Sequence, residues 1–173
     1  MGVDIHSLVE VKTNGKWVIV KHAIFDDYGD IETAEFFEKR NYAVFGFLAD
    51  VRNYSCCQPI CEPKGFPDDS EYLNSSIYGS DRNIINDLQE DSSYHSRGWL
   101  TLKELLDFDY EQKFWNKRPV FPNQWNNQFL VNEGEGQPIT YRKHLGEGFF
   151  KDIEVLKTLG NPEDVRIIFW FND

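Results

Sequence analysis

The C-terminal run Val-Arg-Ile-Ile-Phe-Trp-Phe, residues 165–171, constrains the fold more than any other segment. A strand with one exposed face alternates apolar and polar residues, whereas an almost wholly apolar run predicts a strand that is buried on both faces. Near the N-terminus, residues 4–11 alternate, Thr-Asn-Gly-Lys at 13–16 supplies a turn, and residues 17–20 are aromatic and β-branched. These features predict a β-hairpin, and we expect the C-terminal strand to lie centrally beside it.

Helices are predicted at several places between these strands. Residues 42–51 place apolar side chains at helical spacing, and Thr101 and Glu104 form a capping box that opens a helix through residue 108. Thr33 is expected to cap a short helix, with Glu35 in its first turn. A last helix is expected over residues 141–159, with Gly146 and Gly148 able to break it early.

The chain length of 173 residues fits one domain that buries a substantial core. Residues 53–80 are rich in Pro, Gly, Ser and Asp and predict a long loop, while residues 92–100 are expected to form the loop that leads to the helix at 101. Residues 113–138 are polar and contain three prolines, which predicts an irregular insertion. The expected fold is therefore α+β, with a small, mainly antiparallel sheet formed by the hairpin and the C-terminal strand, and with helices packed on it.

The composition limits the classes of partner. With 18 basic and 29 acidic residues, the formal net charge of −11 argues against binding to a nucleic-acid backbone, and the acidic surface is expected mainly to favour solubility. Cys56, Cys57 and Cys61 are clustered, which favours free thiols in a reducing cytoplasm over a disulfide framework. The sequence also contains no apolar run long enough to predict a membrane span. The oligomeric state is left open, with a homo-oligomer as one alternative.

A first candidate site is built on Asp4, His6 and His95. Alternation along a strand places Asp4 and His6 on the same face, so that a carboxylate lies next to an imidazole. Together with His95, they are candidate ligands of a divalent metal ion or catalytic acid/base groups. The alternative is a hydrogen-bonded structural pair.

A second candidate site surrounds the helix predicted at 42–51. Arg40 and Asn41 precede it and Arg52 and Asn53 follow it, so these side chains could converge on an anionic or phosphorylated ligand. The alternative is that both arginines form salt bridges, with Asp50 as the nearest partner. The aromatic walls of the site would come from Tyr42, Phe66 and Trp99. The loop at 59–69, with Glu62, would form a lid or a further wall, and the alternative is that this loop is only a rigid connection.

Several of these strings resemble a family of small uncharacterised proteins of bacteriophage and prophage genomes. The resemblance rests on Asp-Ile-His at 4–6, Arg-Asn-Tyr at 40–42, Leu-Ala-Asp-Val-Arg-Asn at 48–53 and the Glu-Pro-x-Gly-x-Pro loop at 62–67, and it extends to His-Ser at 95–96, Trp-Leu-Thr at 99–101 and the C-terminal strand. It implies an origin and a shared site rather than a mechanism. The cysteines at 56 and 57 depart from the pattern.

Three functions are compatible with these features. The leading hypothesis is a phage-type accessory protein that binds a small, anionic, nucleotide-like ligand and counters a host defence signal. The second is a metal-assisted phosphoester hydrolase that uses Asp4, His6 and His95. The third is an acidic protein that inhibits a host nuclease. The first two predict a concave site around Asp4, His6 and Arg40, whereas the third predicts ordinary pairs there and an acidic surface that binds the partner.

Overall fold

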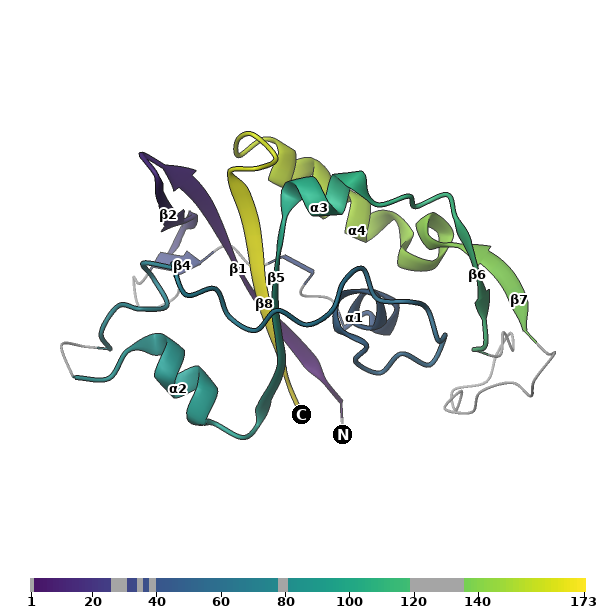
Figure 1. Ribbon diagram of the computed structural model, residues 1–173, viewed down its shortest axis with the longest axis horizontal. Coiled ribbons are helices and arrows are strands. Elements are labelled where there is room, and N and C mark those ends of the chain that lie inside the picture. The colour runs from purple at the N-terminus through teal and green to yellow at the C-terminus, as the bar shows by residue number, and fades with distance from the viewer. Residues whose placement is uncertain (1, 26–30, 34–35, 38–39, 78–80, 119–135) are drawn as a thin grey trace. The chain divides into compact units, whose positions relative to one another are not determined.

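The computed structural model describes residues 2–25, 31–33, 36–37, 40–77, 81–118 and 136–173 (Figure 1). Within these residues the chain is α+β, with four helices, one four-stranded antiparallel sheet and two two-stranded sheets. It divides into two compact units. Unit 1 comprises residues 1–40, 63–107 and 152–173, and unit 2 comprises residues 41–62 and 108–151. The single domain expected from chain length stays a prediction, and each unit is described by itself.

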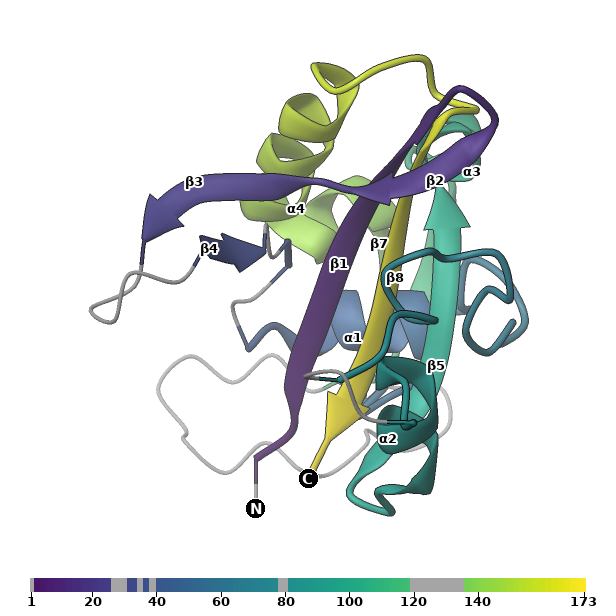
Figure 2. The same ribbon diagram turned by 90° about the vertical axis from the view of Figure 1, so that its left-hand side faces the viewer.

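The main sheet of unit 1 has four strands in the order β2-β1-β8-β5, and Figure 2 shows β8 between β1 and β5. They are β1 (Asp4–Thr13), β2 (Lys16–Ile19), β5 (Tyr94–Thr101) and β8 (Val165–Asn172), and all neighbours are antiparallel. The central position of β8 confirms the expectation from its apolar sequence. Because β8 has a strand on each side and covered faces, all its residues from 165 to 171 are buried.

The β1–β2 hairpin forms as predicted from its Asn-Gly turn. Asn14 and Gly15 both have positive φ, at 51° and 79°. Two consecutive residues with positive φ are required by the tight turn whose twist matches that of antiparallel strands, and Asn-Gly is the pair that adopts it most readily. The turn thereby sets the register in which Lys12 faces Trp17.

Side chains from residues 63–90 cover one face of this sheet. Leu8, Ile168 and Trp170 on this face pack against Phe66 and Leu73, and α2 (Ile84–Glu90) adds Ile84, Ile85 and Leu88. No sequence pattern noted above predicts α2. It is a short helix that Asn83 caps by accepting a hydrogen bond from the backbone N–H of Asn86.

The remaining elements of unit 1 are β3 (Lys21–Phe25), β4 (Ile31–Thr33) and α3 (Leu102–Asp107). Thr33, expected to start a helix, is the last residue of β4, and Glu35 lies outside the described residues. The predicted capping box is confirmed at α3. The Thr101 N–H donates to Glu104 Oε2 at 2.9 Å, and the Glu104 N–H donates to Thr101 Oγ1 at 3.2 Å.

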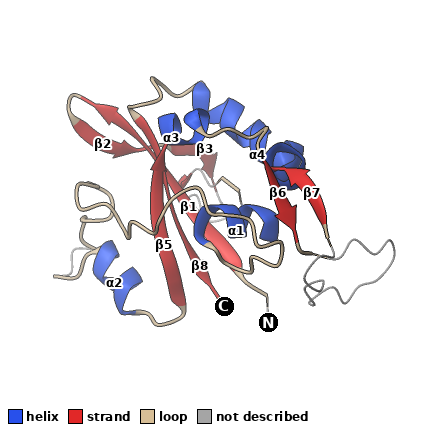
Figure 3. Cartoon of the chain, turned by 45° about the vertical axis from the view of Figure 1, so that its right-hand side comes forward, coloured by secondary structure: helices blue, strands red, loops and turns tan. Residues whose placement is uncertain are grey.

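Unit 2 contains α1 (Tyr42–Ala49), β6 (Lys113–Asn116), β7 (Gln137–Thr140) and the first part of α4 (Tyr141–Lys157), whose last turns belong to unit 1 (Figure 3). Aromatic rings fill its core: Phe47 on α1 lies within 6 Å, centroid to centroid, of four other rings, those of Phe108, Tyr110, Tyr141 and Phe149. The helix α4 is kinked at Gly146, where φ is 80°, as expected for a glycine that interrupts a helical pattern.

The segment predicted as an irregular insertion, 113–138, begins and ends in regular structure. Its first four residues form β6, which pairs antiparallel with β7, and β7 starts at Gln137. Residues 119–135 lie outside the described part of the chain. None of the described helices combines the length and the apolar character needed to cross a membrane.

Candidate functional site

The three predicted metal ligands Asp4, His6 and His95 all lie in unit 1 but not on one face. His95 belongs to β5 rather than to a loop, and it pairs with Phe171, which also pairs with Ile5 on β1. Because neighbouring residues of a strand point to opposite faces, His95 shares the face of Ile5, whereas Asp4 and His6 point to the other face. No group of three or more His, Cys, Asp or Glu side chains among the described residues is arranged to hold a metal ion.

Each member of this trio has another partner. His6 Nε2 lies 3.0 Å from Asn172 Oδ1, and the His6 ring stacks on Trp170 with its centroid 5.5 Å away. His95 Nδ1 lies 2.9 Å from Ser96 Oγ, and its ring stacks on Phe171. Packing against neighbouring side chains therefore accounts for the position of each ring. The two imidazoles lie on opposite faces of the sheet.

Asp4 pairs with Arg40, the first residue of the predicted anion site. The Arg40 guanidinium donates from NH2 to Asp4 Oδ1 at 2.6 Å and to Oδ2 at 2.8 Å, and from Nε to Oδ1 at 2.9 Å. The salt-bridge alternative therefore holds for Arg40, although its partner is Asp4 and not Asp50. A guanidinium fork already engaged with a carboxylate is less available for phosphate.

Asn41 and Tyr42 lie in unit 2, where Asn41 caps α1 and Tyr42 packs in its first turn. Asn41 Oδ1 accepts the backbone N–H of Ala43 and caps the helix, and its Nδ2 donates to the carbonyl of Leu145. The Tyr42 ring contacts Phe45 and Tyr54. Because both side chains have structural partners, neither supports the predicted ligand role.

Asn53 organises the chain after α1. Its Nδ2 donates to Asp50 Oδ1 and to the carbonyl of Cys57, each at 2.7 Å, while its Oδ1 accepts the backbone N–H of Cys57 and the Ser55 hydroxyl, each at 3.1 Å. Asp50, Arg52 and Cys56 all have positive φ in this loop. Non-glycine residues seldom adopt this conformation, so the hydrogen bonds of Asn53 hold a strained loop closed.

This loop reaches His144 on α4 through Ser55, a contact that sequence reasoning missed. Ser55 is only 4% exposed, and its Oγ lies 3.1 Å from His144 Nε2. Burial and then the positive charge of Arg118 lower the pKa of His144 to about 4, so the ring is neutral at pH 7. Burial also raises the pKa of Cys57 to about 11, so its thiol stays protonated and is a poor nucleophile. Because Ser55 and His144 are 89 positions apart in the sequence, no local signal marks the pair.

A second buried polar network links β1 and β8 in unit 1. Glu10 and Arg166 lie directly opposite each other and are 0% and 1% exposed. Arg166 donates from Nε to Glu10 Oε2 at 2.8 Å and from NH1 to Asp69 Oδ1 at 2.7 Å, and Ser70 Oγ donates to Glu10 Oε1 at 2.5 Å. The two buried charges, Glu10 and Arg166, balance each other, and Asp69 is an exposed second carboxylate on Arg166, so the network fixes the sheet rather than offering a site for an ion.

Two of the predicted aromatic walls, Trp99 and Phe66, lie in unit 1, and Trp99 lies beside this network. The ring of Trp99, on β5, has its centroid 4.3 Å from Lys64 Nζ and 5.6 Å from the guanidinium of Arg166. Phe66 is buried and meets Trp170 edge to face. Glu62 is exposed at the end of a chain segment of unit 2. The predicted ligand residues are thus divided between the two units.

The net charge is divided very unevenly between the two units. Unit 1 contains 22 acidic and 11 basic residues, whereas unit 2 contains seven of each. The whole net charge of −11 therefore resides in unit 1. Residues 68–91 contribute seven acidic residues against one arginine.

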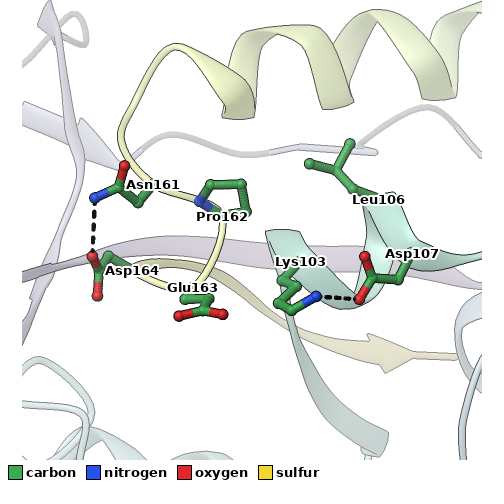
Figure 4. Close-up of a pocket in the computed structure, with 7 residues that line it drawn as sticks. All are labelled: Lys103, Leu106, Asp107, Asn161, Pro162, Glu163 and Asp164. Carbon is green, nitrogen blue, oxygen red and sulfur yellow. Dashed lines mark hydrogen bonds and ion pairs between the residues drawn. The ribbon is translucent and has the colours of Figure 1, made fainter.

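Described residues of unit 1 line two acidic hollows. The α3 hollow, of about 390 Å³, lies between α3 and residues 161–164 (Figure 4), and the α2 hollow, of about 480 Å³, is lined by residues of 82–94. Each has three carboxylates and one basic side chain. The α3 hollow has Asp107, Glu163 and Asp164 with Lys103, and the α2 hollow has Asp87, Glu90 and Asp91 with Arg82.

One group in each hollow has a shifted pKa, and both shifts favour the charged form. A hydrogen bond with Asp107 raises the pKa of Lys103, so this amine stays positive and pairs with that carboxylate at 2.5 Å. Hydrogen bonds from Ser93 lower the pKa of Asp91, so this carboxyl stays ionised. Arg82 is held by Asp87 at 2.5 Å and by Glu90 at 2.7 Å. Each hollow therefore retains a formal excess of two negative charges.

Comparison of the chain with protein-family models, with curated proteins and with solved structures finds no match.

Proposed function

We propose that this chain is an interaction protein that binds a basic protein partner through the acidic surface of unit 1. The observation that carries the proposal is the division of charge between the units. Unit 1 carries the whole net charge of −11, and each of its two hollows is lined by three carboxylates and one basic side chain. Lysine and arginine side chains of a partner would enter these hollows and neutralise them. Complementary charge of this kind accelerates encounter and selects the partner.

The partner class follows from the same chemistry. Proteins that bind nucleic acid present basic surfaces to phosphate, so an acidic protein surface competes for them. A nuclease is therefore the favoured class of partner, and inhibition of a host nuclease is the consequence if the phage resemblance holds.

The two other functions expected from the sequence have weaker support. Arg40 forms a salt bridge with Asp4, and both the nitrogen and the oxygen of the Asn53 amide already form hydrogen bonds. The predicted catalytic histidines lie on opposite faces of the sheet. The nucleotide-type ligand and the phosphoester hydrolase stay predictions.

A pair of charge-matched variants tests the proposal. Glu90→Gln with Glu163→Gln removes one carboxylate from each hollow of unit 1, and Glu62→Gln with Glu147→Gln removes two exposed carboxylates from unit 2. Both doubles change the net charge equally. Binding to a folded basic protein, ribonuclease A, is measured by calorimetry at several salt concentrations.

We expect the unit 1 double to weaken binding several-fold, since an exposed ion pair contributes about 0.2–1 kcal/mol, and the unit 2 double to leave it nearly unchanged. Affinity should fall as salt rises. Equal losses in the two doubles, or no salt-dependent binding by the unaltered protein, would refute the proposal.

A further inference from the structure

The two hollows of unit 1 differ in how far neighbouring side chains occupy their carboxylates. In the α2 hollow, Arg82 pairs with Asp87 at 2.5 Å and with Glu90 at 2.7 Å. The third carboxylate, Asp91, accepts the backbone N–H of Ser93 at 2.9 Å and its hydroxyl at 2.7 Å. All three carboxylates of this hollow therefore have a partner within the chain, and a cation from outside would also meet the positive charge of Arg82.

The α3 hollow leaves one carboxylate without such a partner. Lys103 pairs with Asp107 at 2.5 Å, and Asn161 Nδ2 lies 3.5 Å from Asp164 Oδ2. Figure 4 shows both contacts and none to the exposed side chain of Glu163. Within the part of the chain that the structure describes, no group donates a hydrogen bond to Glu163 or forms an ion pair with it. Its carboxylate can therefore accept a cation from a partner.

Apolar surface lines the same hollow. Leu106 on α3 is 40% exposed, and Pro162 is exposed in the loop on the other side of the hollow. Both residues line the volume of about 390 Å³ that Glu163 also lines. Covering an exposed leucine with an aliphatic chain removes both from water, which is favourable. The α3 hollow thus offers apolar surface and an unpaired negative charge to one ligand.

Lysine is the side chain that matches this combination. Its four methylene groups can cover apolar surface while its ammonium group, a compact charge, stays at the rim. A compact charge suits Glu163, because no neighbour fixes the direction of that carboxylate. Arginine, by contrast, gains specificity from a carboxylate that is oriented for two parallel hydrogen bonds.

We propose that the α3 hollow is the main binding site for the basic partner and receives one lysine side chain. The stem of this lysine lies on Leu106 and Pro162, and its ammonium group pairs with Glu163. The assignment rests on the function proposed for unit 1, and it specifies which hollow binds and which side chain enters it. The α2 hollow then contributes only its long-range negative field.

Two single variants test the choice of hollow. Glu163→Gln and Glu90→Gln each remove one carboxylate from one hollow, so both proteins have the same net charge. In calorimetry with ribonuclease A, Glu163→Gln should weaken binding roughly two- to fivefold, the effect of losing an exposed ion pair. Glu90→Gln should weaken binding by less than about 1.5-fold, because Arg82 already neutralises that carboxylate.

The apolar contact is tested by Leu106→Ala, which leaves every charge in place. This variant should weaken binding roughly three- to tenfold, since several buried carbon atoms are lost. The loss should persist at high salt, where the contribution of charge is screened. Val155→Ala is the matched control, because Val155 is 47% exposed on a helix of unit 1 and does not line the hollow. It should leave the affinity unchanged, and thermal melts of both variants should match the unaltered protein.

The identity of the entering side chain is tested with tetralysine and tetraarginine. The methyl NMR signals of Leu106 in the full chain report contact with the stem of the entering residue. Tetralysine should shift these signals more strongly than tetraarginine, and Glu163→Gln should remove most of the shift.

Three results would overturn the assignment while leaving the proposed function in place. They are equal losses in Glu163→Gln and Glu90→Gln, a loss in Leu106→Ala no larger than that in Val155→Ala, and larger methyl shifts with tetraarginine than with tetralysine. Absence of salt-dependent binding of ribonuclease A by the unaltered protein would instead refute the proposed function itself.

Discussion

At the scale of single residues, two side chains each hold several partners together. Asn53 closes the loop after α1 with hydrogen bonds from both ends of its amide, and Arg166 connects Glu10 to Asp69 within unit 1. Both are polar groups in tightly packed surroundings. Their neighbours should therefore tolerate little change in volume, since a displaced buried polar group loses its hydrogen bonds.

Gly46 provides a direct test at Asn53. A Cβ at this position would lie 2.8 Å from Asn53 Oδ1, so Gly46→Ala should displace the amide. We expect a loss of about 1–3 kcal/mol in the free energy of unfolding, which exceeds the gain of about 1 kcal/mol from better helix propensity. Gly148→Ala is the control, because nothing lies within 4 Å of its Cβ, and it should stabilise the protein. Urea unfolding of both variants decides; stabilisation by Gly46→Ala would contradict the account.

His144 gives a prediction for pH. Burial holds its pKa at about 4 in the folded protein, below the ordinary value of 6.5, so between these values the unfolded chain binds more protons. Stability should therefore fall as the pH is lowered from 6.5 to 4, and this loss should be smaller in His144→Gln. Melting temperatures across that range measure the difference, and parallel curves for the two proteins would show that His144 does not contribute.

At the scale of secondary-structure elements, the sequence predicts those whose signals lie among a few neighbouring residues. The hairpin, α1, α3 and β8 follow from turn residues, caps and hydrophobic pattern. The strand β5 was missed because its alternation is broken: its register shifts between His95 and Gly98, and Ser96 has a φ of 49°. A bulge of this kind moves side chains to the other face, which is also why the predicted trio of Asp4, His6 and His95 does not meet.

The capping box at α3 should contribute measurably to stability. Thr101→Ala removes the hydroxyl that accepts the Glu104 N–H and should cost about 0.5–2 kcal/mol. Thr101→Ser keeps the acceptor and should recover most of this loss. Chemical denaturation of the two variants provides the measurement, and equal stability of the alanine and serine variants would show that the cap is dispensable.

The Glu10–Arg166 pair should behave as a unit that fixes the register of β1 against β8. Arg166→Met alone leaves a buried carboxylate without its cation, and we expect a loss of about 3–5 kcal/mol. Glu10→Met combined with Arg166→Met removes both charges and should lose clearly less than the single variant. A double-mutant cycle measures the coupling, and additive losses would mean that the two side chains act independently.

At the scale of the whole molecule, the sequence predicted the fold class but not the site. The α+β sheet with a central C-terminal strand follows from pattern. Pairs such as Arg40 with Asp4 or Ser55 with His144 join residues far apart in the chain, so no local sequence spacing predicts them. The division of charge was equally hidden, because unit 1 is assembled from three separate segments.

The central claim is that the acidic surface of unit 1 is where a basic partner binds. An amide NMR titration of the full chain with ribonuclease A tests it most directly, because every described backbone N–H reports separately. We expect the largest shift changes at residues 81–91, 103–107 and 161–164, around the two hollows, and their loss at high salt. Changes of equal size in unit 2, or none in these three segments, would contradict the account.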